Sequence, residues 1–196
     1  RTYGSLSATF NKKYREGFEP LLPGVSHVSY NNIEALGKAV NEETAAVILE
    51  VMQGEGGVYP ASLEYIQAAR RICDERGALL IVDEIQTGFG RTGKMFALEH
   101  AGVEADITCL AKGIASGLPL GAIVAKTSVM TWPSGSHAST FGGNPVACHA
   151  ALTTIDLLQR EYLANTNARG VELRAGLTQL ASKYPTTLSG VRGLGL

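Results

Sequence analysis

The chain has 196 residues, 45% hydrophobic and 18% charged, so it is long enough for one globular domain with a core and short for two. The net charge is −1, and the sequence has neither a basic stripe nor an acidic block. This charge pattern gives no indication of nucleic acid or an anionic membrane as a partner. Three widely spaced cysteines argue against a disulfide framework and indicate a reducing, cytoplasmic compartment, and no apolar run is long enough to span a bilayer.

Short β-rich runs alternate with helical runs along the chain. This alternation predicts an α/β fold with a mostly parallel sheet covered by helices. The expected strands are residues 25–30, 45–51, 78–82, 107–110 and 122–125, and the expected helices are residues 33–40, 62–76, 144–158 and 163–182.

The segment 62–76 has the clearest helical period, because its apolar residues recur on one face and Gly77 follows as a stop. The next run, 78–82, is continuously apolar, which predicts a strand buried on both faces. Asn144 and Pro145 are a good cap and first position for the helix after them. The chain begins at Arg1 without a methionine and stops within 191–196, a run that reads as the start of a strand, so we expect an internal fragment of a longer protein.

Polar residues follow three of the expected strands. Glu50 ends the first strand, Asp83 ends the second, and Lys112 comes just after the third. In an open α/β sheet ligands bind outside the carboxyl ends of the strands. A carboxylate at a strand end is more often a cap than a catalyst, and a lone lysine is usually a solvated surface charge. Lys112 differs because it follows an apolar strand between small residues, so we expect a confined and nucleophilic amine.

Two nucleotide-binding motifs compete with this interpretation. Residues 88–93 match G-x-G-x-x-G, and residues 88–94 match a P-loop until Met95 replaces the Ser or Thr that should hold magnesium. In a P-loop protein the glycine loop and the acidic strand are separate elements, whereas here they are contiguous. In a dinucleotide fold the glycines follow the strand directly, whereas here residues 83–87 intervene. Neither motif therefore has the context that its chemistry needs.

Four segments of the chain, which occur in the same order as in that family, resemble the class III aminotransferases of fold type I, which depend on pyridoxal phosphate. The most specific is Asp-Glu-Ile-Gln-Thr-Gly-Phe-Gly-Arg-Thr-Gly at 83–93, and the likeness extends over essentially the whole chain. The other three segments are residues 50–57, 110–122 and 139–145.

The resemblance implies a role for each matching residue. Lys112 would bind the cofactor covalently and move a proton, and Asp83 would keep the ring nitrogen protonated. Gln86 would hydrogen-bond the phenolic oxygen of the ring, and Glu50 belongs to the cofactor-binding set. Thr140, with Ser139, would reach the phosphate of the neighbouring subunit's cofactor, which implies a homodimer.

Two further residues are implied in substrate binding. Arg1 would bind a substrate carboxylate, and Glu55 would pair with an arginine further downstream, switching the site between amino donor and oxo-acid acceptor; surface charge is the simpler explanation for both. Residues 1–160 would belong to the large cofactor-binding domain and 161–196 to the start of a small C-terminal domain. The four histidines show no ligand spacing, so we expect no metal.

The resemblance implies a ping-pong transamination with 2-oxoglutarate as acceptor. Residues 13–24 and 30–36 look most like acetylornithine aminotransferases of arginine biosynthesis, whereas residues 112–119 are equally similar to 4-aminobutyrate aminotransferases. An aminomutase on the same scaffold and a cofactor-free binding module remain as alternatives.

Overall fold

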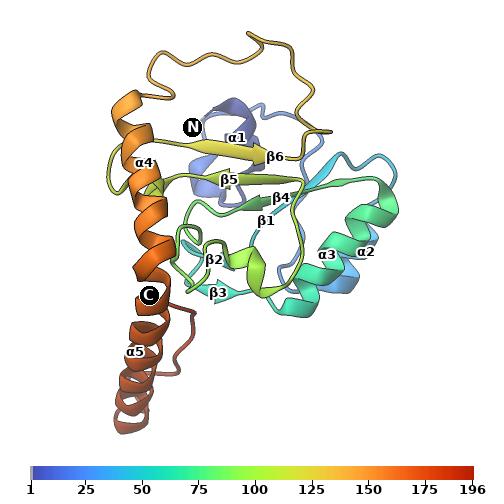
Figure 1. Ribbon diagram of the computed structural model, residues 1–196. Coiled ribbons are helices and arrows are strands. Elements are labelled where there is room, and N and C mark those ends of the chain that lie inside the picture. The colour runs from blue at the N-terminus through green and yellow to red at the C-terminus, as the bar shows by residue number, and fades with distance from the viewer. Residues whose placement is uncertain (1) are drawn as a thin grey trace.

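The computed structural model describes residues 2–196, and Figure 1 shows how its elements are arranged. The helical elements are α1 (Tyr3–Ala8), η1 (Lys12–Tyr14), α2 (Ile33–Ala39), α3 (Leu63–Arg76), η2 (Ala97–His100), η3 (Lys112–Ala115), α4 (Pro145–Leu157), the π-helix Leu158–Tyr162 and α5 (Leu163–Lys183). The strands are β1 (Ala46–Glu50), β2 (Met52–Gln53), β3 (Tyr59–Pro60), β4 (Leu79–Asp83), β5 (Ile107–Leu110) and β6 (Ala122–Ala125).

A four-stranded sheet organises the molecule, with the strand order β1-β4-β5-β6. The strands β1, β4 and β5 are parallel, and β6 joins the edge antiparallel to β5. The predicted α/β class with a mostly parallel sheet is confirmed. The strands expected at 45–51, 78–82, 107–110 and 122–125 all form, each within one or two residues of its expected bounds.

The hydrophobic core lies between one face of the sheet and the pair α2 and α3. Helix α3 begins at the cap Ser62, whose side chain accepts from the Tyr65 N–H, and ends at Gly77, which has φ 70°. Its buried face packs against Leu80 and Val82 of β4, both 0% exposed. The amphipathic period therefore predicted this layer correctly, because an apolar stripe must be buried against another element.

The other face of the sheet is less covered by the described residues. Ile48 on β1 is 56% exposed and Ile123 on β6 is 60% exposed, while Ile81 and Ile107 are half-buried. The expected burial of β4 on both faces is therefore met on one face only, since α2 and α3 pack on the face of Leu80 and Val82.

The strand expected at 25–30 does not form, and neither does one at 191–196. The first segment is held by side chains instead of a strand ladder. The Tyr30 hydroxyl donates to the Glu50 and Val51 carbonyls at 2.8 and 3.1 Å, and Val28 packs against the core. A β-rich composition becomes a strand only where a sheet edge offers unpaired backbone N–H and C=O groups.

The C-terminal helices form one continuous column that leads away from the sheet (Figure 1). Asn144 caps α4, accepting from the Val146 and Ala147 N–H groups at 2.9 and 3.3 Å, as its position before Pro145 predicted. The π-helix joins α4 to α5, and the domain boundary expected at 160 falls inside it. That boundary stays a prediction. None of the helices within residues 2–196 has both the length and the apolar character of a membrane-spanning segment.

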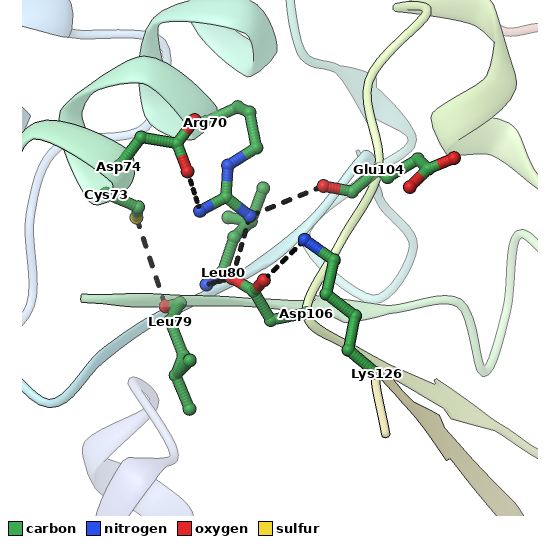
Figure 2. A network of polar contacts seen from close by, with 8 residues as sticks. All are labelled: Arg70, Cys73, Asp74, Leu79, Leu80, Glu104, Asp106 and Lys126. Atoms are coloured by element: carbon green, nitrogen blue, oxygen red, sulfur yellow. Dashed lines mark hydrogen bonds and ion pairs between the residues drawn. The ribbon is translucent and has the colours of Figure 1, made fainter. Parts of the chain in front are cut away.

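A buried ion-pair network fixes the amino ends of β4 and β5 (Figure 2). Asp106 accepts from Arg70 of α3 at 2.7 Å, from Lys126 at 2.8 Å and from the Leu80 N–H at 2.8 Å. Burial opposes ionisation of this carboxyl, but the three donors outweigh it and lower the pKa of Asp106 to about 2. The network ties α3 to two strands at the sheet edge opposite the polar strand ends.

Candidate active site

Strand register brings the predicted residues to one edge of the sheet. Glu50 pairs with Asp83, and Asp83 pairs with Cys109 on the next strand. Register partners point to the same face, so these three side chains share it. Lys112 follows two residues after the end of β5, at the start of η3. The sheet therefore places an acid at the ends of β1 and β4 beside the lysine that follows β5.

Asp83 and its neighbour Glu84 have opposite surroundings. Asp83 is half-buried, and its Oδ1 accepts from the Ile85 N–H at 2.9 Å. Glu84 is 0% exposed and accepts from the Thr87 hydroxyl and from the Ala97 and Leu98 N–H groups at 3.1 and 2.8 Å. Glu84 thus anchors the start of η2 beneath the site, a role that sequence reasoning missed. The alternation of the strand carries the signal, because Glu84 continues the buried positions 80 and 82.

Lys112 adopts a left-handed conformation, with φ 44°. This region is uncommon for a residue with a side chain, and its strain is typical of a functional site. The side chain lines a cavity of about 500 Å³ together with Gln86, Met52 and Gly113. Lys112 is nevertheless exposed. The expectation of a confined amine is therefore wrong for the described residues, because the cavity is open to solvent.

The β2–β3 hairpin packs directly on Gln86. A β-carbon added at Gly54 would lie 1.9 Å from Gln86 Oε1. The Gly54 N–H in turn donates to Glu50 Oε2 at 3.0 Å. Glycine at position 54 therefore leaves room for the Gln86 amide to pack on the backbone, while the N–H of the same residue binds the Glu50 carboxylate.

The charges of the strand ends act on one another. Burial raises the pKa of Glu50, the Gly54 N–H lowers it, the charge of Asp83 raises it and the charge of Lys112 lowers it. Burial also raises the pKa of the Cys109 thiol, and the charge of Asp83 adds to this effect. The two carboxylates and the amine are thus close enough to interact, as an active site requires.

The structure does not bring every predicted site residue to this cavity. Ser139 and Thr140 are exposed on the loop between β6 and α4, where Ser139 Oγ accepts from the Gly142 N–H at 3.0 Å. Glu55 is exposed on the hairpin and does not line the cavity, and neither do Asp83 and Glu50. Arg1 lies outside the described residues. The roles of these residues stay predictions.

The glycines of 88–93 serve packing. A β-carbon at Gly90 would lie 2.8 Å from Leu158 Cδ2, and one at Gly93 would lie 2.2 Å from Asn167 Oδ1. A four-residue 3-10 helix, η2, comes after them, beginning only at Ala97. A phosphate-binding loop needs a helix whose N-terminus follows the glycines directly. The loop instead seats the C-terminal helical column.

The residues that are present suit pyridoxal phosphate. An amine, a carboxylate and an amide come from the ends of neighbouring strands, and the cavity has the size of a small-molecule site. Among residues 2–196 no group of three or more His, Cys, Asp or Glu side chains could hold a metal ion.

The chain has relatives of known family over its whole length. The family described as aminotransferase class-III matches residues 1–196. The acetylornithine aminotransferase of Caldanaerobacter subterraneus subsp. tengcongensis is 49% identical, over 100% of this chain and 50% of that protein. The acetylornithine aminotransferase of Gloeobacter violaceus is 48% identical, over 100% of this chain and 49% of that protein. The chain spans about half the length of these curated relatives.

Solved structures share its fold. The ornithine aminotransferase of Toxoplasma gondii ME49 superposes with a TM-score of 0.94 at 34% identity, covering 100% of this chain and 48% of that one. A second structure of that enzyme, described with partial occupancy of PLP at its active site, has a TM-score of 0.94 at 36% identity, with coverage of 100% and 47%. An omega-transaminase from Thermomicrobium roseum has a TM-score of 0.88 at 34% identity, with coverage of 100% and 49%.

Proposed function

Since this chain belongs to the class III aminotransferase family, we propose that the complete protein binds pyridoxal phosphate and moves the terminal amino group of N-acetylornithine to 2-oxoglutarate. The reaction would be a ping-pong transamination that serves arginine biosynthesis. The cytoplasmic location indicated by the cysteine content belongs to the same proposal.

One observation carries the cofactor site. Asp83 pairs in register with Cys109, three residues before Lys112. A carboxylate at the end of β4 and an amine just after β5 are therefore neighbours, and the two groups differ in charge. This pair is what pyridoxal phosphate needs, because one group attaches it and the other stabilises its protonated ring nitrogen.

Three residues of this chain would then have separate roles in binding the cofactor and in proton transfer. When bound, pyridoxal phosphate supplies an electron-withdrawing ring that stabilises negative charge on the substrate carbon. Lys112 Nζ would hold the cofactor and would then carry the proton that the substrate carbon gives up and regains. Asp83 would pair with the ring nitrogen, and the Gln86 amide would donate to the phenolic oxygen.

The choice of donor rests on similarity. Two relatives named acetylornithine aminotransferase are 49% and 48% identical to this chain over the aligned residues, which cover the whole of this chain and about half of each relative. The solved neighbours include ornithine aminotransferases and an omega-transaminase, whose names also indicate terminal amines as substrates. The lysine segment at 112–119 keeps 4-aminobutyrate as the alternative donor, and an aminomutase is the less favoured alternative.

The loop that carries Ser139 and Thr140 supports the homodimer. Both residues are exposed, and Phe141 beside them is 87% exposed. An exposed turn that does not line the cavity of its own chain suits the phosphate of a second subunit's cofactor. An active and strictly monomeric parent protein would exclude this arrangement.

The visible spectrum of the full-length protein tests the function. We expect an absorbance band from the bound cofactor that fades with N-acetylornithine and returns with 2-oxoglutarate. If only 4-aminobutyrate removes the band, the family holds and the donor is wrong. Amino transfer that never depends on 2-oxoglutarate would favour the aminomutase. No band after addition of pyridoxal phosphate would exclude the function.

A further inference from the structure

The C-terminal segment is joined to the glycine hairpin by one arginine. Arg192 Nε donates to the Gly57 and Val58 carbonyl oxygens at 3.0 and 3.1 Å, and Nη2 donates to the Gly57 oxygen at 2.7 Å. The guanidinium also lies over the Tyr59 ring, 4.1 Å from its centroid. Arg192 thus binds three consecutive residues of a hairpin that precedes it by more than 130 positions in the chain.

The turn that Arg192 binds is strained. Val58 has φ 55°, a left-handed conformation that is a genuine outlier for a β-branched residue. Gly57 has φ 112°, and a β-carbon there would lie 3.0 Å from the Tyr59 ring and 3.5 Å from Arg192 Nη2. Such a backbone persists only where its surroundings hold it. Arg192 donates hydrogen bonds to the carbonyl groups of Gly57 and Val58, which lie on either side of the strained Val58 α-carbon.

The same contact builds a wall of the cavity. Val58 and Arg192 line it from one side, and Lys112 and Gln86 line it as well. The hairpin also carries Gly54, whose backbone packs on Gln86, and Glu55, which follows directly. Loss of the Arg192 contacts would therefore shift the backbone of residues 54–58, and with it the position of Glu55 and the packing on Gln86.

We infer that Arg192 is a positioning residue of the active site, which holds the hairpin of residues 52–60 in its strained form and so sets the place of Glu55. The inference rests on the proposed function and on the role that the family resemblance implies for Glu55, which is to distinguish the amino donor from the oxo acid. Arg192 binds carbonyl oxygens and the Tyr59 ring, so it is distinct from the downstream arginine expected to pair with Glu55. Lysine cannot replace it fully, because a single ammonium does not present the planar fork of donors.

The test uses the full-length protein and three variants. Arg192→Gln removes the charge and most donors, and Arg192→Lys keeps the charge. Arg169→Gln is the matched control, because Arg169 is an exposed arginine on α5 whose ion-pair partner among residues 2–196 is Glu172 of its own helix.

Hydrogen exchange of the protein without cofactor gives the first readout. We expect the amides of residues 54–58 to exchange about tenfold faster in Arg192→Gln than in the parent, with Arg192→Lys between the two. Arg169→Gln should match the parent. Unchanged exchange in Arg192→Gln would overturn the inference, whatever reaction the protein catalyses.

The rates of the two half-reactions give the second readout. In Arg192→Gln the ratio of kcat/KM for N-acetylornithine to that for 2-oxoglutarate should change by about tenfold, because a displaced Glu55 affects the two substrates differently. A merely structural role would lower both values together, and that result would overturn the positioning role. A parent protein without any transamination would refute the proposed function instead, and the exchange measurement would still decide whether Arg192 holds the hairpin.

Discussion

Gly54 and Gln86 are packed so closely that a β-carbon on the glycine would lie 1.9 Å from Oε1 of the glutamine. Substitution Gly54→Ala should therefore displace the Gln86 amide and cost roughly 1–3 kcal/mol of stability, the usual penalty for overpacking. We expect weaker binding of pyridoxal phosphate, measured by titration of the full-length protein. Gly176→Ala is the control, because the added carbon would meet no atom within 4 Å in the described part of the chain apart from its own helix backbone. Equal affinity in both variants would show that Gln86 does not need this space.

Lys112 combines a proposed chemical role with a strained backbone. Lys112→Ala and Lys112→Gly should both lower transamination by at least about a thousandfold, because both remove the amine. The two variants should differ in stability, with the glycine variant more stable by about 1 kcal/mol, since φ 44° costs an alanine more than a glycine. Chemical denaturation measures that difference. Substantial activity in either variant would remove Lys112 from the mechanism.

Glu84 should stabilise the fold while Asp83 serves the chemistry. Glu84→Ala leaves the buried Ala97 and Leu98 N–H groups without their acceptor, and we expect a loss of roughly 3–5 kcal/mol in urea unfolding. Glu99→Ala should cost under about 1 kcal/mol, because Glu99 is exposed and accepts from the Phe96 N–H at the surface. Similar losses of unfolding free energy in Glu84→Ala and Glu99→Ala would contradict the structural role assigned to Glu84.

Asp106 should make stability depend on acidity. Its folded pKa of about 2 lies below the ordinary value of 3.8, so its contribution is complete above pH 4 and is lost as pH falls toward 2. The linkage corresponds to roughly 2 kcal/mol. Asp106→Asn should lose this stability at neutral pH and flatten the dependence between pH 4 and 2. Asp74→Asn is the control, because Asp74 is 63% exposed in its pair with Arg70.

Much of the layer structure could be predicted from the sequence. The period of residues 62–76, with Gly77 after it, predicted α3 and its C-terminal end, because these signals act within a few residues. The order of Glu50, Asp83 and Lys112 behind apolar runs predicted their meeting at one sheet edge. Parallel strands carry their carboxyl ends to the same side, so this consequence follows from the fold class.

The predictions that were wrong depended on contacts between segments far apart in the chain. The segment 25–30 has the composition of a strand and forms none, because a strand needs an unpaired neighbour. Lys112 was expected to be confined and is exposed, because exposure depends on what packs above a residue. Residues 88–93 matched two phosphate motifs, yet Gly90 and Gly93 are required by Leu158 and Asn167, which lie more than 60 positions away.

By itself the sequence determined the family, most of the element types and the set of reactive groups, since each depends on residue identity and short-range periodicity. Tertiary structure alone decided that Gln86 lies on Gly54 and that Arg192 reaches the hairpin. These relationships depend on the packing of distant segments, where volume and hydrogen-bond geometry select a partner that no local pattern encodes.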